Sequence, residues 1–202
     1  MNNEHWKFID KIIYINLEER KDRKELIEKE LSFIEENKII RFNAFKNKKG
    51  GIGCMMSHIA CLELAITNNW NNVLILEDDA KFNNYDIGIK LLHHLLNNKW
   101  DVISLGCTFV NYNKNTFKLN SGQCASGYLV NKHYYQTLLN NLKEALTKYI
   151  ETDCWSKYAN DQYWKILQKT DNWYVIVPSL IIQRPSFSSI ENRNVDYTRL
   201  FP

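Results

Sequence analysis

The feature that most constrains the fold is the segment of residues 72–82, which reads NVLILEDDAKF. An apolar run at residues 73–76 leads directly into three consecutive carboxylates, Glu77, Asp78 and Asp79. The run is too short for a useful helix and is typical of a buried strand in an α/β sheet. Carboxylates crowded at the carboxyl end of a strand repel one another unless a cation lies there, and open α/β sheets bind ligands at that edge. The segment therefore favours a hard divalent ion with a phosphate-bearing ligand, and a solvated acidic loop is the alternative that the triplet alone leaves open.

Strand-like and helix-like patterns alternate along the rest of the chain. Strands are expected at residues 11–17, 39–45, 73–76, 101–105, 125–130, 173–177 and 180–183. Helices are expected at residues 18–37, 54–69, 87–97, 132–149 and 161–168. This alternation predicts an α/β fold with a mostly parallel central sheet flanked by helices. We expect one domain over residues 1–202, with a core from about residue 10 to residue 192, a hairpin-like stretch at 107–123 and an irregular tail from Arg184.

Composition excludes several classes of protein. The net charge of +3 and the pI of about 8.5 are too weak to indicate nucleic-acid binding. The polar start of the chain leads us to expect no secretory signal, and we expect no membrane-spanning stretch. The five cysteines include no CxxC pair, so free thiols in a reducing cytoplasm are expected. Asn, Lys and Ile are abundant, and their codons are AT-rich, which fits the genome of a bacterium or a large DNA virus. A viral protein would work in the host cytoplasm. A homodimer is compatible with the sequence.

The segment of residues 15–23, INLEERKDR, carries a first group of candidate site residues. Asn16 closes the first expected strand, and Arg20 and Arg23 follow at the mouth of the sheet. Guanidinium groups there could pair with a diphosphate, and the asparagine could contact a base or ribose. Ion pairs within a charged first helical turn are the simpler interpretation.

Residues 50–58, GGIGCMMSH, form a second group. We expect residues 46–53 to be a basic, glycine-rich loop in which backbone N–H groups approach an anion before a helix begins. Ser57 and His58 would lie just inside that helix, and His58 falls off its apolar stripe. The basic stretch from Arg41 to Lys49 could face a phosphate, although a solvated loop explains it equally.

Two further segments offer contacts to a ligand. In SGQCASGYLV, residues 121–130, Gly127 permits close backbone approach and Tyr128 offers a ring for a sugar, with core packing as the alternative for the tyrosine. In NDQYW, residues 160–164, Asp161 opens a short helix. It is either the N-cap of that helix or a general base that deprotonates an acceptor hydroxyl.

Taken together and in this order, these segments resemble glycosyltransferase family 25, which includes lipooligosaccharide β-galactosyltransferases and procollagen galactosyltransferases. The GCxxSH and LEDDA motifs at this separation are specific, and the resemblance covers about residues 11 to 191. The matching stretches are IIYINLEERKDR, RFNAF, GIGCMMSH, VLILEDDAKF, WDVISLG, SGYLV and VIVPSLIIQRPSFSSI.

The resemblance implies a GT-A-like fold, a UDP-sugar donor, a divalent metal, Mn²⁺ or Mg²⁺, and inversion at the anomeric carbon during transfer of a hexose to a hydroxyl of a glycan or glycoprotein. Glu77 and Asp79 correspond to the metal-binding motif, and Asp161 to the catalytic base. The positions implied to contact the nucleotide-sugar are Asn16, Arg20, Arg23, Asn43, Ser57, His58, Glu77, Asp78, Gly127 and Tyr128. The stretch from Ala125 to Tyr128 departs from the family pattern, which leaves the donated sugar open among galactose, glucose and N-acetylglucosamine.

Two other functions remain alternatives on the sequence. One is another metal-dependent enzyme of phosphate chemistry, such as a nucleotidyltransferase or a phosphatase that uses aspartates at a strand end. The other is a degenerate transferase that binds a glycan or nucleotide without turnover. The acidic motif is complete, which argues against degeneration.

Overall fold

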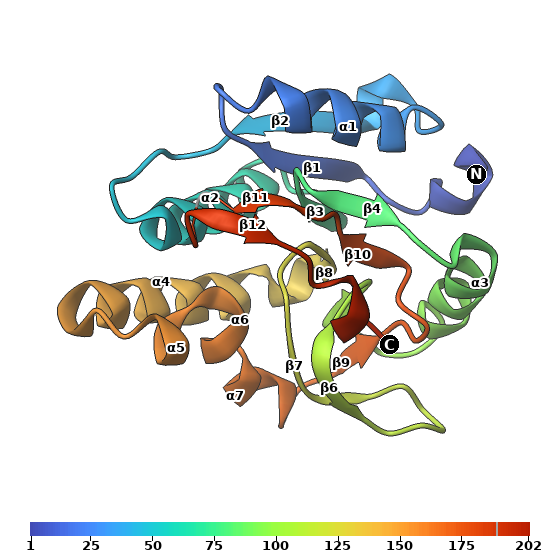
Figure 1. Cartoon of the computed structure of the whole chain (residues 1–202). Helices are drawn as coiled ribbons and strands as arrows, with labels where there is room; N and C mark the ends of the chain where they lie inside the picture. Colours follow the sequence, from blue (N-terminus) through green and yellow to red (C-terminus); the bar gives the residue numbers. More distant parts are fainter. Residues whose placement is uncertain (189) are drawn as a thin grey trace.

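A six-stranded mixed sheet forms the centre of the computed structural model, which describes residues 1–188 and 190–202 (Figure 1). Its strands, in spatial order, are β2 (Ile39–Asn43), β1 (Lys11–Asn16), β3 (Asn72–Glu77), β8 (Gly127–Asn131), β5 (Val102–Ser104) and β9 (Trp173–Val175). All of them run in the same direction except β8, which is antiparallel to both of its neighbours. The expected mostly parallel sheet is confirmed.

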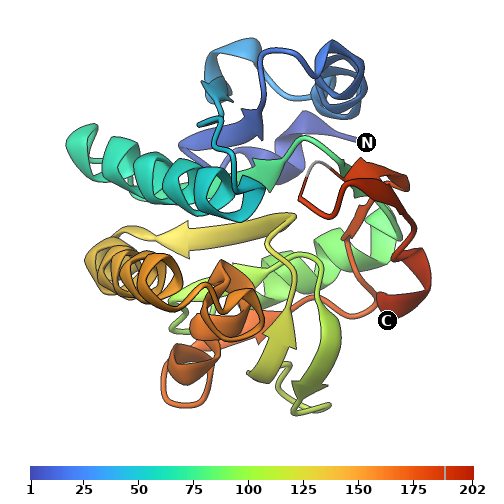
Figure 2. The same cartoon turned by 60° about the vertical axis from the view of Figure 1, so that its left-hand side comes forward.

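Helices cover both faces of this sheet (Figure 2). Ile13 and Ile75 point to a core shared with α2 (Gly50–Thr67) and α4 (Tyr135–Thr152). Ile12 and Leu74 point to the opposite core, shared with α1 (Lys21–Leu31) and α3 (Tyr85–Leu95). Successive side chains of a strand face opposite sides of a sheet. Burial on both sides therefore explains why β3 is apolar throughout.

Short elements complete the chain. They are β4 (Ala80–Phe82), β6 (Thr108–Tyr112), β7 (Leu119–Gln123), α5 (Trp155–Tyr158), α6 (Asn160–Tyr163), α7 (Lys165–Gln168), β10 (Ile181–Gln183), β11 (Ser186–Ser188) and β12 (Arg193–Val195). Strands β6 and β7 form the expected hairpin. The tail from Arg184 is not irregular as expected, because β11 pairs with β12. The strand expected at residues 180–183 is β10, which pairs with β4 directly after the acidic triplet.

The expected glycine-rich loop at residues 46–53 is partly wrong, because α2 begins at Gly50. A Cβ atom on Gly53 would lie 2.2 Å from the carbonyl oxygen of Phe45, and one on Gly51 would lie 2.4 Å from the Trp155 ring. These glycines therefore allow α2 to pack closely against its neighbours. They do not form an anion-binding loop ahead of the helix.

Helix boundaries also differ from expectation. The helix expected at residues 18–37 is the shorter α1, and the one expected at 161–168 is divided into α6 and α7. Helix α2 is long and apolar enough to cross a membrane by length and composition alone. Half of it is buried, and it packs in the core between the sheet and α4.

Candidate functional site

The carboxyl ends of β1 and β3 bring the first group of candidate residues together. The two strands are parallel neighbours with Ile15 opposite Glu77, so Asn16 lies level with the acidic triplet. The Asn16 Nδ2 atom donates a 2.8 Å hydrogen bond to Asp78 Oδ2. From the first turn of α1, Arg23 Nη1 lies 2.8 Å from Asp78 Oδ1 and 3.1 Å from Asp79 Oδ2. The Arg23 guanidinium therefore pairs with two adjacent carboxylates.

Among these carboxylates, Asp79 is the one whose pKa is raised most. It is buried, and Gln183 Nε2 donates a 3.1 Å hydrogen bond to its Oδ2 atom, while its buried Oδ1 atom has no partner among the described residues. Burial and then the charge of Glu77 raise the pKa of Asp79 to about 7. Burial also raises the pKa of Asp78, although Arg23 opposes this effect. Among the described residues, Arg23 is the one cation that pairs with Asp78 and Asp79.

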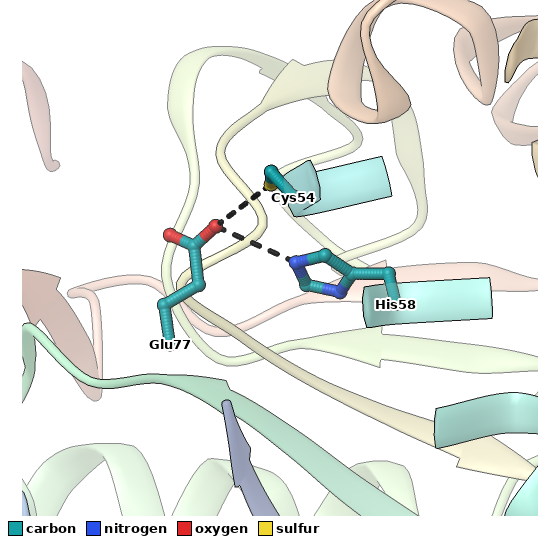
Figure 3. Close-up of side chains that lie close together, drawn as sticks. All are labelled: Cys54, His58 and Glu77. Atoms are coloured by element: carbon teal, nitrogen blue, oxygen red, sulfur yellow. Dashed lines mark hydrogen bonds and ion pairs between the residues drawn. The ribbon is translucent and has the colours of Figure 1, made fainter. Parts of the chain in front are cut away.

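Glu77 points toward α2, where it meets Cys54 and His58 (Figure 3). Its Oε1 atom lies 3.4 Å from His58 Nε2 and 3.8 Å from Cys54 Sγ, and its Oε2 atom accepts a 3.3 Å hydrogen bond from Ser126 Oγ. Burial opposes ionisation of Glu77, but His58, Arg23 and Ser126 together hold its pKa below the ordinary value. Burial and the neighbouring Glu77 charge raise the pKa of the Cys54 thiol well above its usual range.

Two cavities adjoin at Glu77. The smaller, of about 290 Å³, opens in front of the acidic triplet and is lined by Arg20, Arg23, Lys46 and Lys48 among others. The larger, of about 570 Å³, lies toward α5 and α6. The residues that line both are Cys54, Glu77, Gln183, Ser188 and Ile190. Lys46 and Lys48 of the basic stretch thus line the cavity, whereas Lys49 pairs with Asp153. Arg41 donates from its side chain to Asn16 and pairs with Glu18.

Asp161 lines the larger cavity. Its Oδ2 atom accepts a 3.0 Å hydrogen bond from the backbone N–H of Cys124, and Gln162 donates to its Oδ1 atom at 3.3 Å. The N-cap position of α6 is occupied by Ala159, so the interpretation of Asp161 as a helix cap is wrong. Burial raises the pKa of Asp161, and the Cys124 N–H partly offsets this.

Several residues expected to contact a ligand make close packing contacts inside the protein. Tyr128 is 1% exposed, packs between His58 and Trp164, and offers no free ring face, which supports core packing. His58 is buried too, although it falls off the apolar stripe of its helix. A Cβ atom on Gly127 would lie 3.1 Å from Leu76 and from Ile181, so close packing accounts for this glycine.

Ser57 and Asn43 lie in different surroundings. The Ser57 hydroxyl borders the smaller cavity, but it accepts from the Phe45 N–H at 2.9 Å and donates to the Gly53 carbonyl at 2.7 Å. It therefore fastens the start of α2. Asn43 is exposed at the end of β2 and lines neither of these two cavities.

Sequence reasoning missed Cys54, Ser126 and Gln183 at this site. Cys54 precedes His58 by four residues on a helix, a spacing that places both side chains on one face, so this signal was present in the sequence. Gln183 and Ser126 reach the triplet from β10 and from the start of β8, and only the tertiary fold brings them there.

The acidic edge fits a divalent cation with oxygen ligands. Glu77, Asp78 and Asp79 offer three negative charges against the one positive charge of Arg23, and the orphaned Asp79 Oδ1 atom is a buried oxygen without a donor among the described residues. A hard cation prefers such carboxylate ligands. It would supply the charge that the described residues around Asp79 lack.

Comparisons with known proteins agree with this picture. Residues 46–156, more than half of the 202, match glycosyltransferase family 25, described as an LPS biosynthesis protein family. A search of curated proteins finds no match.

Comparison with solved structures gives two similar proteins. One is a glycosyltransferase involved in the glycosylation of the major capsid of PBCV-1, with a TM-score of 0.55 and 12% identity over 86% of this chain and 92% of that chain. Another is the glycosyltransferase GlyE of Streptococcus pneumoniae TIGR4, with a TM-score of 0.47 and 11% identity over 84% of this chain and 45% of that chain. At such identities the first likeness concerns the fold alone and confirms the expected GT-A-like architecture.

Proposed function

Because this chain belongs to glycosyltransferase family 25, we propose that it transfers a hexose from a UDP-sugar to a hydroxyl of a glycan or glycoprotein, with inversion and with help from a divalent metal. Galactose, glucose and N-acetylglucosamine are the candidate sugars. The observation that carries this proposal is the junction of two cavities at Glu77. One cavity combines carboxylates with basic side chains, and the other contains a separate buried carboxylate, Asp161.

The smaller cavity fits the diphosphate of the donor. Arg20, Lys46 and Lys48 line it, and their charges would offset those of the phosphates. Glu77 and Asp79 would hold Mn²⁺ or Mg²⁺, for which Asp79 has an oxygen without a hydrogen-bond partner among the described residues. When bound, the ion supplies a Lewis acid that neutralises charge on the departing UDP.

Asp161 is the proposed catalytic base in the larger cavity. A raised pKa makes its carboxylate a stronger base than an ordinary aspartate, so it accepts a proton more readily near neutral pH. It would take the proton of the acceptor hydroxyl while that oxygen bonds to the anomeric carbon and the bond to the UDP oxygen breaks. Attack from the face opposite UDP gives inversion in a single displacement.

Aromatic side chains in the same cavity fit a saccharide acceptor. Phe109 is 64% exposed, with φ of 49°, and the ring of Trp155 packs against Gly51 and Tyr149. Both residues line the cavity that contains Asp161. Binding sites for small molecules are commonly lined by such rings with a few polar groups that fix orientation.

A thermal-shift panel tests the donor site. The protein is heated with UDP-glucose, UDP-galactose, UDP-N-acetylglucosamine, UDP, GDP or ATP, each with and without Mn²⁺. Ligands that bind only the folded state raise its stability, so uridine nucleotides should raise Tm and should need the metal to do so. A preference for ATP would favour the phosphate-chemistry alternative, and no shift with any uridine nucleotide would contradict the proposal.

We also propose that the enzyme works in the cytoplasm. All five cysteines are free thiols, and none is engaged in a disulfide. Free thiols persist in a reducing compartment, which supports this location.

A further inference from the structure

Cys54, His58 and Glu77 converge on one point at the junction of the two cavities (Figure 3). Helix α2 presents Cys54 and His58 from one face, and Glu77 meets them from the end of β3. One ligand atom from each residue lies within 4.8 Å of the other two. The thiol and the imidazole are metal ligands that the oxygen-rich donor site does not use, whereas the Glu77 carboxylate is shared with that site.

Two of the three ligand pairs have nearly the spacing of a tetrahedral centre. Bonds to Zn²⁺ of about 2.3 Å from sulfur and about 2.0–2.1 Å from nitrogen or oxygen place tetrahedral ligand atoms roughly 3.3–3.6 Å apart. The observed distances from Glu77 Oε1 are 3.4 Å to His58 Nε2 and 3.8 Å to Cys54 Sγ. These two ligand pairs thus need only a few tenths of an ångström of movement to receive the ion.

Neighbouring groups orient two of the three ligands. The Tyr128 hydroxyl lies 2.8 Å from His58 Nδ1, which directs Nε2 toward Glu77. Ser126 Oγ donates to Glu77 Oε2, which leaves Oε1 facing Cys54 and His58. Metal-binding histidines and carboxylates usually have such outer partners, which fix ring orientation and ligand basicity.

We propose that Cys54, His58 and Glu77 form a binding site for a thiophilic divalent cation, with Zn²⁺ as the best fit. Sulfur and imidazole ligands select Zn²⁺ over Mg²⁺ and Mn²⁺. The thiolate and the carboxylate balance its two charges, and the thiol proton passes to solvent on binding. Cys54 and Glu77 line both cavities while His58 is buried behind them, so the fourth ligand position opens to the cavities, where water would complete the coordination.

One consequence rests on the proposed function. Glu77 belongs both to this cluster and to the set of carboxylates assigned to the donor metal. An ion held by Cys54 and His58 would withdraw Glu77 from the donor site. Micromolar Zn²⁺ should therefore inhibit transfer in competition with Mn²⁺, whereas binding of Zn²⁺ itself requires no glycosyltransferase activity.

Cobalt titration of the metal-free full-length protein tests the site directly. Co²⁺ should bind in a one-to-one ratio with a thiolate-to-metal charge-transfer absorption, and Zn²⁺ should displace it. Cys54→Ser should abolish that absorption. Cys124→Ser is the matched control, since Cys124 also lines the larger cavity and its Sγ atom contacts Ser126 at 3.0 Å, and it should keep the absorption.

Absence of the band in wild type, or its persistence in Cys54→Ser, overturns the proposal. Alkylation of the wild-type protein covers the case in which Cys54→Ser fails to fold. Zn²⁺ should slow the modification of Cys54 and leave that of the half-buried Cys154 unchanged, and equal rates at Cys54 with and without Zn²⁺ refute the site. If cobalt binds as expected but Zn²⁺ leaves UDP release unaffected, the metal site is supported and the competition for Glu77 is wrong. If no UDP is released even without Zn²⁺, the proposed function is contradicted and the metal site is not.

Discussion

The Asp161 carboxylate accepts a 3.0 Å hydrogen bond from the backbone N–H of Cys124, which ties the proposed base to the connection between β7 and β8. Cys124 has φ of 88°, a left-handed conformation that a non-glycine residue adopts only when its surroundings hold it there. The same hydrogen bond favours the ionised carboxylate against the effect of burial. One contact thus positions the loop and keeps the base available.

Asp161→Asn should reduce the rate of transfer by roughly 10²–10⁴-fold, because general-base catalysis contributes about that much. Asparagine keeps a side-chain oxygen for the Cys124 N–H, so the fold and the affinity for UDP should be retained. Steady-state kinetics and UDP titration measure both quantities. Asp153→Asn is the matched control, since Asp153 is exposed with φ of 55°, which asparagine tolerates. Near-normal turnover in Asp161→Asn would contradict the base assignment.

The same carboxylate should govern the acidic limb of the pH–rate profile. A base acts only when it is deprotonated, so kcat/KM should rise with pH through the pKa of Asp161. Because burial raises that pKa, the limb should lie above the ordinary aspartate value of 3.8. The limb should vanish from the residual activity of Asp161→Asn. An unchanged limb in the variant would assign it to another group.

Stability of the metal-free protein should depend on pH through Asp79. The pKa of this carboxyl is about 7 in the folded protein, against 3.8 for an ordinary solvated aspartate, so between these values the folded protein binds more protons than the unfolded one. Stability must therefore fall as pH rises from about 4 to about 7. Mn²⁺ should restore more stability at pH 8 than at pH 5, which thermal unfolding at both pH values measures. Asp79→Asn should remove this difference, and its persistence in that variant would exclude Asp79 as the cause.

Arg23→Gln should lower the free energy of unfolding by about 3–5 kcal/mol, the usual cost of leaving a buried charge without its partner. The Arg23 side chain is 13% exposed and pairs with Asp78 and Asp79. Part of the loss should be recovered at pH 5, where these carboxylates take up protons more readily. Denaturant unfolding at two pH values is the measurement. Arg193→Gln breaks an exposed pair with Glu191 and should change little, and an equal effect of both variants would contradict this role of Arg23.

Gly53→Ala should destabilise the fold strongly, because the new methyl group would lie 2.2 Å from the Phe45 carbonyl oxygen and backbone would have to move. Gly50→Ala, at the first residue of the same helix, is the control and should be neutral or stabilising, since alanine favours a helix over glycine. Thermal unfolding of the two variants gives the comparison. Similar Tm values would show that close approach of α2 to residue 45 does not require glycine.

Local patterns were sufficient to place the acidic triplet at a strand end. Val73 and Ile75 face one core, and Leu74 and Leu76 face the other, so β3 is apolar throughout. A continuous apolar run of this kind predicts a strand that is buried on both faces. The nearby motifs of α1 and α2 also reach the same edge because parallel strands end together. These parts of the site follow from short-range sequence.

Other features of the site depend on contacts between residues far apart in the sequence, which local patterns do not predict. Gly51 and Gly53 resemble a loop in sequence, and only the approach of Trp155 and Phe45 shows that they belong to a helix. The direction of β8 is likewise a property of topology and leaves no local trace. Burial of Tyr128 depends on Trp164, which lies 36 residues further along the chain (164 − 128).

Acceptor-dependent release of UDP is the measurement that tests the central claim most directly. Wild-type protein with Mn²⁺ is incubated with each of the three UDP-sugars and a panel of glycan acceptors, and the anomeric configuration of the product is read by NMR. We predict UDP release that requires the acceptor, a product of inverted configuration, and loss of both in Asp161→Asn. Retained configuration, or no release from any UDP-sugar that the protein binds, would contradict the proposed mechanism.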